Sequence, residues 1–352
     1  MNPKSLTDDL KISLTRELIT PKNVMDEFPM TQKTIDTVVQ ARNDIINILN
    51  NENDRLMIVV GPCSIHDVDA ALEYGEKLKK VIKNVNQNIL IIMRVYFEKP
   101  RTVVGWKGLI NDPNLDNSFE INKGVKIARK LLLDLAEMGI PSGHEYLDLI
   151  SPQYISDLVS WGAIGARTTE SQSHRELASG LSCPVGFKNG TNGEIQIAID
   201  AMKAAQRPHN FLSVTKEGKS AIFSTTGNKD CHIILRGGKT SNYSHKHVEA
   251  VSAMLKQHKF KPIVMIDASH ANSNKDYKKQ NIVINDICQQ IKNGNNNIFG
   301  VMIESNLVEG KQDIADRSKL TYGQSITDAC IGWSETEDLI FKLNESLLSI
   351  KK

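Results

Sequence analysis

The sequence lacks the long apolar run that a membrane-spanning helix requires. None of its uninterrupted apolar stretches approaches the roughly 20 residues that cross a bilayer. The N-terminus begins Met1-Asn2-Pro3-Lys4 and has no apolar core like that of a secretory signal peptide. Basic residues form no blocks interleaved with aromatic residues, and the formal net charge is only +2. We therefore expect a protein that binds neither membranes nor nucleic acids.

Cysteine is also scarce. The five cysteines, at positions 63, 183, 231, 288 and 330, are odd in number and far apart along the chain. Small secreted proteins that depend on disulfides carry a denser and usually even set. A chain of 352 residues can bury a large core without such cross-links. We therefore expect free thiols and a cytoplasmic protein.

What the sequence does contain is a series of eight short apolar runs that stop at, or just before, a charged or metal-capable residue. Runs of this kind are typical of buried parallel strands. The predicted strands are 57–60, 89–95, 144–148, 163–167, 184–188, 232–236, 263–267 and 298–304. The predicted helices are 34–49, 69–82, 121–138, 152–160, 194–205, 245–257, 277–292 and 335–349. This alternation predicts an α/β fold, a (β/α)8 TIM barrel, because reactive residues at the C-terminal ends of such strands are typical of that barrel.

Two regions lie outside the alternating pattern. Residues 1–50 are predicted to form an N-terminal arm and a helix, and residues 209–228 an inserted β-hairpin between strands 5 and 6. A long loop, 96–120, follows strand 2, and long loops on barrels are usually functional or disordered. The sequence shows no internal repeat, so a single domain over 1–352 is predicted. The arm and the hairpin are either regulatory or assembly elements, or decoration without a function.

Four side chains near the strand ends form a candidate metal site. Cys63, His270 and Glu304 follow or end strands 1, 7 and 8, which are adjacent in a closed barrel, and Asp328 lies in the loop beyond. A thiolate, an imidazole and two carboxylates suit Mn²⁺, Fe²⁺, Co²⁺ or Zn²⁺ better than Ca²⁺. The alternative is ordinary for each residue alone, since a lone cysteine after a strand is more often a small buried apolar residue.

Six cations flank the same strand ends. They are Arg94, Lys99, Arg101, Arg167, Lys188 and Arg236. Directed into one pocket they would repel one another, which is tolerable when phosphates or carboxylates occupy the pocket. Surface charge is the alternative, and it is weak where a cation directly follows an apolar strand. Lys188 could instead form a Schiff base, as in barrel aldolases, but the metal ligands would then have no purpose.

Seven segments carry a resemblance to a known family. They are GPCSIHD (61–67), RVYFEKPRTVVGWKGLINDP (94–113), WGAIGARTTESQ (161–172), CPVGFKNGTNG (183–193), CHIILRGGK (231–239), IDASHANS (266–273) and YGQSITDACIGW (322–333). Over nearly its whole length the chain resembles the type I alpha 3-deoxy-D-arabino-heptulosonate-7-phosphate (DAHP) synthases, and most of all the phenylalanine-sensitive ones. The resemblance implies a transferase that condenses phosphoenolpyruvate with erythrose 4-phosphate and water. The products would be DAHP and phosphate, in the first step of the shikimate pathway to chorismate and the aromatic amino acids.

The resemblance also implies roles for individual residues. One divalent ion per subunit would be held by Cys63, His270, Glu304 and Asp328, with Asp328 also near substrate. Lys99 is the expected proton donor, and Glu145 is expected to orient the attacking water. The carboxylate of phosphoenolpyruvate would meet Arg94, Lys99 and Lys188, and its phosphate Ala166, Arg167 and Arg236. The phosphate of erythrose 4-phosphate would meet Arg101 and Thr102.

Feedback inhibition by an aromatic amino acid is a further implication, in a homotetramer built as a dimer of dimers. The arm residues Asp8, Asp9 and Ile12 of a neighbouring subunit would cover the effector. The pocket itself would be lined by Pro152, Gln153, Leu181, Ser182, Phe211 and Ser213. Ser213 favours phenylalanine, because tyrosine-sensitive relatives tend to carry Gly there. Tyr146 stands where the phenylalanine-sensitive type has Phe, which leaves the identity of the effector open.

Two other functions compete with this interpretation. A 3-deoxyoctulosonate 8-phosphate synthase would be a related enzyme, but it would show a different loop in place of Lys99-Pro100-Arg101-Thr102 and would lack the arm. A barrel without activity could serve as an amino-acid sensor. It would be expected to lose Lys99, Glu145 or a metal ligand, and all of these are present.

Overall fold

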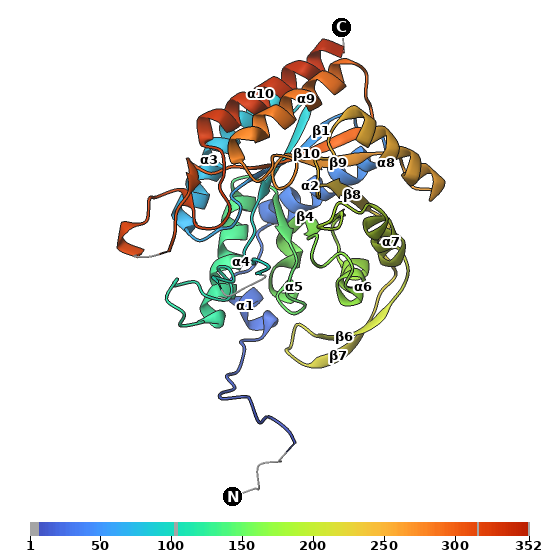
Figure 1. Ribbon diagram of the computed structural model, residues 1–352. Coiled ribbons are helices and arrows are strands. Elements are labelled where there is room, and N and C mark those ends of the chain that lie inside the picture. The colour runs from blue at the N-terminus through green and yellow to red at the C-terminus, as the bar shows by residue number, and fades with distance from the viewer. Residues whose placement is uncertain (1–6, 102–104, 315–316, 351–352) are drawn as a thin grey trace, which may run out of the picture.

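The computed structural model describes residues 7–101, 105–314 and 317–350, and Figure 1 shows a barrel surrounded by helices. Eight parallel strands close in the order β1-β10-β9-β8-β5-β4-β3-β2. They are β1 (Leu56–Gly61), β2 (Ile89–Arg94), β3 (Ser142–Glu145), β4 (Val159–Ile164), β5 (Val185–Lys188), β8 (Cys231–Leu235), β9 (Val264–Asp267) and β10 (Ile298–Glu304). The predicted (β/α)8 barrel is confirmed. No helix among the described residues is long and apolar enough to cross a membrane.

Two helices precede the first strand, and the others follow strands around the barrel. They are α1 (Pro21–Glu27), α2 (Gln32–Leu49), α3 (Val68–Val85), α4 (Ile121–Glu137), α5 (Pro152–Ile155), α6 (Gln172–Gly180), α7 (Gln196–Ala205), α8 (His245–Gln257), α9 (Gln280–Lys292) and α10 (Trp333–Ile350). Helix α2 begins after Thr31, whose side chain accepts a hydrogen bond from the Thr34 amide. Its buried Ala41 and Ile45 join Met57 in one cluster with the barrel interior. Helix α2 therefore packs against the N-terminal end of the barrel.

Two strand predictions were displaced. The third and fourth strands were predicted at 144–148 and 163–167, but β3 and β4 lie two to four residues earlier. The predicted helix 152–160 is also too long, because α5 ends at Ile155 and a short 3-10 turn (Ser156–Leu158) leads into β4. Gly165 accounts for the end of β4, since its carbonyl accepts hydrogen bonds from the amides of Thr168 and Thr169 and the chain turns. The arginine at 167 therefore lies on a turn rather than in the strand.

The insertion between β5 and β8 is an antiparallel hairpin. Strands β6 (Asn210–Val214) and β7 (Ser220–Ser224) pair with Phe211 opposite Phe223 and Leu212 opposite Ile222. The two phenylalanine rings lie 6.0 Å apart on one face. On the other face Leu212 and Ile222 are 85% and 73% exposed. Figure 1 shows the hairpin beyond the helical ring, beside α6. Its outer face is therefore an apolar surface without cover in the described part of the chain.

The N-terminal arm leaves the barrel in an extended path (Figure 1). The Ile19 amide donates to Asn122 Oδ1, and the Ile19 carbonyl accepts from the Tyr154 hydroxyl. Those two contacts fix the base of the arm against α4 and α5. Further out, Leu10 and Ile12 are exposed. The arm is therefore attached at its base and presents apolar side chains at its outer end.

A small addition follows the last barrel strand. Strands β11 (Val308–Lys311) and β12 (Gln324–Ser325) form a two-stranded parallel sheet. A bridge between Ser305 and Ile331 ties the end of this addition to the end of β10. The addition therefore returns the chain to the C-terminal mouth of the barrel, where it places Asp328.

Candidate active site

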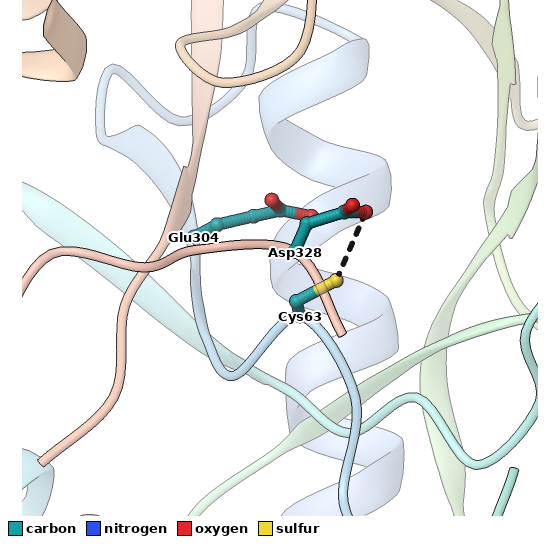
Figure 2. Close-up of side chains that lie close together, drawn as sticks. All are labelled: Cys63, Glu304 and Asp328. Carbon is teal, nitrogen blue, oxygen red and sulfur yellow. Dashed lines mark hydrogen bonds between the residues drawn. The ribbon is translucent and has the colours of Figure 1, made fainter. Parts of the chain in front are cut away.

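A thiol and two carboxylates converge at the C-terminal mouth of the barrel (Figure 2). One ligand atom from each of Cys63, Glu304 and Asp328 lies within 4.8 Å of the other two. The Cys63 Sγ is 3.4 Å from Asp328 Oδ2. Cys63 follows β1 and Glu304 ends β10, which is the neighbour of β1 with Gly61 in register with Glu304. Strand pairing thus brings together residues 241 positions apart (304 − 63).

His270 lies at the edge of this group. Its Nε2 is 4.0 Å from Glu304 Oε1, while its Nδ1 is 2.9 Å from the buried Asp267 Oδ2. A carboxylate on one ring nitrogen commonly orients the other nitrogen toward a metal. The backbone of His270 is left-handed, with φ at +56°, an uncommon conformation for a residue with a side chain. Three of the four predicted ligands therefore meet directly, and His270 stands beside them.

The donor set suits a divalent ion of borderline softness. Burial raises the pKa of the Cys63 thiol, and the Glu304 carboxylate raises it further, whereas Lys99 opposes them. A thiolate at this position therefore needs positive charge next to it. A divalent cation supplies such charge, and a mixture of sulfur and oxygen donors is the set that Mn²⁺, Fe²⁺, Co²⁺ or Zn²⁺ accepts. The residues present could thus hold one metal ion.

Cations are arranged directly around the candidate metal site. The Nη2 atom of Arg94, whose side chain is 1% exposed, lies 2.8 Å from Glu304 Oε1. The Lys99 Nζ lies 3.1 Å from Cys63 Sγ and 3.9 Å from Asp328 Oδ2. Each predicted substrate cation that lies deep in the barrel therefore already has an anionic neighbour within the site, and this pairing holds the cations in place.

Lys188 joins the predicted water-orienting carboxylate to the same network. Its Nζ lies 3.5 Å from both Glu145 Oε2 and Asp267 Oδ2. Burial alone would raise the pKa of Glu145, but Lys188, Lys99 and Arg94 hold that pKa at about 2. The carboxylate is therefore ionised at neutral pH and can only accept hydrogen bonds.

Two arginines lie nearer the rim. Arg167 is exposed and donates to the Pro100 carbonyl at 3.2 Å. The Nε of Arg236 is buried without a hydrogen-bond partner in the described ranges. Burial lowers the pKa of Arg236, Asp267 opposes this, and the neighbouring Arg167 adds to it. The two guanidinium groups therefore repel one another, and an anion between them would relieve the repulsion.

Comparison with known proteins decides the family. The family model described as the DAHP synthetase I family matches residues 27–340. The chain belongs to the DAHP synthetase I family. It is 59% identical to the Phe-sensitive phospho-2-dehydro-3-deoxyheptonate aldolase of Escherichia coli. The match spans 336 residues and covers 96% of each chain. A Tyr-sensitive aldolase of the same name and organism is 49% identical over 345 residues, covering 98% of this chain and 97% of that one.

A solved structure supports the same conclusion. The phospho-2-dehydro-3-deoxyheptonate aldolase of Francisella tularensis superposes with a TM-score of 0.94 at 54% sequence identity. The match covers 96% of this chain and 99% of that one. This DAHP synthetase I family member therefore shares both the barrel and its additions with a solved relative.

The loop predicted to hold the sugar phosphate lies at the rim. Arg101 is exposed, and its Nε donates to the Trp106 carbonyl at 3.0 Å. Trp106 in turn donates to the Asp112 carbonyl at 2.9 Å, so the loop folds back on itself. Thr102, the second predicted contact, lies outside the described residues. Ala166 is half-buried on the turn after β4.

The residues predicted to bind an effector lie away from the barrel mouth, around the hairpin. Strand β6, with Phe211 and Ser213, contacts α6, which ends just before Leu181 and Ser182. The Lys216 ammonium donates to the Gln153 carbonyl beside Pro152, so the hairpin also touches α5. The arm residues Asp8, Asp9 and Ile12 are exposed. A separate cavity of about 540 Å³ opens at the base of the arm, and none of the predicted effector residues lines it.

Two supporting residues of the site were missing from the predicted set. Asp267 directly follows an apolar run in the sequence, which was a usable signal. Gln280 on α9 holds the backbone of Glu304 from both sides, because its Oε1 accepts from the Glu304 amide and its Nε2 donates to the Glu304 carbonyl, each at 2.9 Å. Nothing in the local sequence of α9 indicates that contact.

Proposed function

We propose that this protein is a metal-dependent DAHP synthase that condenses phosphoenolpyruvate with erythrose 4-phosphate and water. The observation that supports this is a single juxtaposition at the barrel mouth. A thiol and two carboxylates lie within 4.8 Å of one another, and the Lys99 ammonium lies 3.1 Å from that thiol. A metal site and an anion site are therefore contiguous, as a reaction between an aldehyde and a phosphorylated enol requires.

The cations act in binding and in charge stabilisation. Arg94, Lys99 and Lys188 are assigned to the carboxylate of phosphoenolpyruvate, and Arg236, with Arg167 and the Ala166 amide, to its phosphate. Arg101 and Thr102 are assigned to the phosphate of erythrose 4-phosphate. Holding both substrates by their anionic groups places the reacting carbons in contact. Charged groups fixed by the network around Glu304 and Asp267 need no reorganisation as charge develops.

The residues around Cys63 also account for the movement of protons. A divalent ion bound by Cys63, Glu304, Asp328 and His270 would polarise the aldehyde oxygen as a Lewis acid. Burial would lower the pKa of Lys99, but Cys63 and Glu304 hold it above its usual range, so Lys99 carries a proton to give. The methylene carbon of phosphoenolpyruvate bonds to the aldehyde carbon, and the aldehyde oxygen takes that proton. Water oriented by Glu145 adds to the adjacent carbon, which bears the phosphate, and releases one proton as phosphate leaves by C–O cleavage.

Phosphate release from the two substrates tests this function. Release should require phosphoenolpyruvate and erythrose 4-phosphate together, should stop when a chelator removes the metal, and should return on adding Mn²⁺, Fe²⁺, Co²⁺ or Zn²⁺. Absence of release from the metal-loaded protein with both substrates would refute the proposal. Release that persists after chelation and desalting would refute the metal role alone.

We propose phenylalanine as the feedback effector, bound between the hairpin and the ends of α5 and α6. Ser213 supports this choice, as does the higher identity to the Phe-sensitive relative than to the Tyr-sensitive one. Phosphate release should fall with phenylalanine and respond less to tyrosine or tryptophan. Ser182→Phe should fill the pocket and relieve inhibition with turnover intact. Ser173→Phe, at an exposed position on α6, should leave inhibition unchanged. Full inhibition of Ser182→Phe would place the effector elsewhere.

We further propose that the arm and hairpin join subunits into a dimer of dimers. Exposed Leu212 and Ile222 on the hairpin, and Leu10 and Ile12 on the arm, are apolar surfaces that a neighbouring subunit would cover. Light scattering should give the mass of a tetramer. Leu212→Glu with Ile222→Glu should reduce that mass, and an unchanged mass would exclude the hairpin face as an interface.

A further inference from the structure

His144 is a buried histidine beside the proposed active site that has no role in the proposed chemistry. It immediately precedes Glu145 on β3, and alternation along a strand directs its side chain to the opposite side. The ring is 0% exposed. The rings of Tyr96, Phe97 and Tyr146 surround it, with centroids 6.1, 5.4 and 5.2 Å away. A polar ring in such surroundings is costly unless its nitrogens find partners.

Both ring nitrogens face oxygen atoms. The Nδ1 lies 2.9 Å from the Val95 carbonyl oxygen, and the Nε2 lies 3.5 Å from Glu98 Oε2. A carbonyl can only accept a hydrogen bond, so the Nδ1 of His144 donates to the Val95 carbonyl. The Nε2 of His144 is buried without a hydrogen-bond partner in the described residues, and the Glu98 carboxylate is the group that faces it.

Glu98 connects this pair to a third segment. Its side chain is 2% exposed, and its Oε2 accepts a hydrogen bond of 3.1 Å from the Ser151 hydroxyl. The contacts of His144 and Glu98 thus tie together the segment after β2, the strand β3 and the loop before α5. Buried polar groups add little net stability compared with apolar packing, so their best-supported use is to fix one arrangement.

The arrangement that it fixes includes two proposed active-site groups. Val95 and Glu98, the two partners of His144, lie on the segment that leads directly into Lys99. The next residue along β3 is Glu145. We propose that His144 is a positioning residue that bridges Val95 and Glu98 and so aligns Lys99 with Glu145 across the barrel mouth. This inference rests on the proposed function, because it takes the roles of Lys99 and Glu145 from it.

The test compares variants of His144 and Glu98 in the full-length, metal-loaded enzyme by phosphate release. His144→Phe keeps an aromatic ring but removes both ring nitrogens. Its kcat should fall by roughly 10- to 100-fold, the effect of misplacing a catalytic group by about 1 Å. The KM values should change by less, because Arg94, Lys188 and Arg236 still hold phosphoenolpyruvate. Glu98→Gln should stay within about threefold of wild type, since its amide can donate to the Nε2 of a neutral His144.

A matched control lies on the same strand. Ser142 is buried on the same side of β3, and its hydroxyl has no hydrogen-bond partner in the described residues. Ser142→Ala should leave kcat unchanged. If His144→Phe does not fold, His144→Gln replaces it. Its single amide nitrogen cannot reach both Val95 and Glu98, so its kcat should fall below that of wild type, and an unchanged kcat would overturn the positioning role.

The outcomes separate this inference from the proposed function. A folded His144→Phe enzyme with wild-type kcat, whatever its melting temperature, would overturn the positioning role. A Glu98→Gln enzyme as impaired as His144→Phe would overturn the bridge as its basis. Failure of the wild-type enzyme to release phosphate would instead refute the proposed function, since it involves no change at His144.

Discussion

The interior of the barrel differs sharply between its upper half, at the C-terminal ends of the strands, and its lower half, at their N-terminal ends, although the same strands build both. Inward-facing positions two residues apart change from apolar to charged, as from Ile92 to Arg94 on β2 and from Met302 to Glu304 on β10. Because side chains alternate along a strand, each pair lies on the same side, one step apart. One strand therefore supplies an apolar side chain to the core and, one step nearer its C-terminal end, a charged side chain to the active site.

The N-terminal half of the barrel tolerates the buried His232 because that side chain is neutral. His232 lies in the floor of the barrel, and its Nε2 accepts a hydrogen bond of 2.9 Å from the Trp161 indole. Burial lowers the pKa of His232 to about 4. The upper half instead holds charges in pairs, such as Arg94 with Glu304. We therefore expect substitutions in the C-terminal half of the barrel to alter turnover, and substitutions in the N-terminal half to alter stability.

The largest effect on turnover is expected from Cys63→Ala. Loss of the thiolate should weaken metal binding and reduce phosphate release by roughly a thousandfold, because Lewis-acid stabilisation is worth several kcal/mol. Bound metal, measured by elemental analysis, should fall in parallel. Cys288→Ala, a buried cysteine on α9, is the control and should keep both its metal and its turnover. Normal metal content and turnover in Cys63→Ala would contradict the assignment.

Arg236→Met should give the next largest loss. Removal of one preorganised cation should lower kcat/KM for phosphoenolpyruvate by roughly 10²-fold. The melting temperature should not fall, since the substitution removes the repulsion between Arg236 and Arg167. A lower melting temperature with normal kcat/KM would contradict the expectation that changes at the C-terminal half affect turnover and not stability.

A smaller effect is expected at the rim. Arg101→Ala should raise the KM for erythrose 4-phosphate about tenfold, the value of one charge-assisted hydrogen bond. The KM for phosphoenolpyruvate should barely move. Lys107→Ala, an exposed cation on the same loop, should change neither value. Equal increases in both KM values would reject the assignment of Arg101 to one substrate.

The smallest effect on turnover, and a clear one on stability, is expected for His232→Gln. In the folded protein His232 stays neutral down to about pH 4, whereas in the unfolded chain it takes a proton near pH 6.5. Its contribution is therefore present above pH 6.5 and is lost as pH falls to 4, by about 3 kcal/mol. Denaturant unfolding should show this loss in wild type and a smaller one in His232→Gln. If the free energy of unfolding changed with pH in the same way for both proteins, His232 would not be a buried neutral histidine.

The sequence predicted the barrel and its charged mouth because both follow from local pattern. A continuous apolar run that ends in Arg94, Lys188 or Glu304 identifies a buried strand and the side chain at its end together. The positions of β3 and β4 were less accessible. Strand β3 has only four residues and contains Gly143 and His144, so no apolar run marks its start.

Contacts between distant elements could not be predicted from local pattern. Gln280 lies in an ordinary helical sequence, and only the packing of α9 against β10 shows that it holds Glu304. The pairing of His144 with Glu98 joins two segments across a strand interface. His270 was predicted as a ligand from its place after a strand, but its left-handed backbone and its contact with Asp267 appear only in three dimensions.

The placement of Asp328 has a consequence for biosynthesis. The ribosome makes all eight barrel strands, ending with β10, before it reaches the segment that carries this carboxylate. Asp328 is therefore the last of the three clustered ligands to be synthesised. A chain that stopped after β10 would carry every barrel strand but only two of those three ligands.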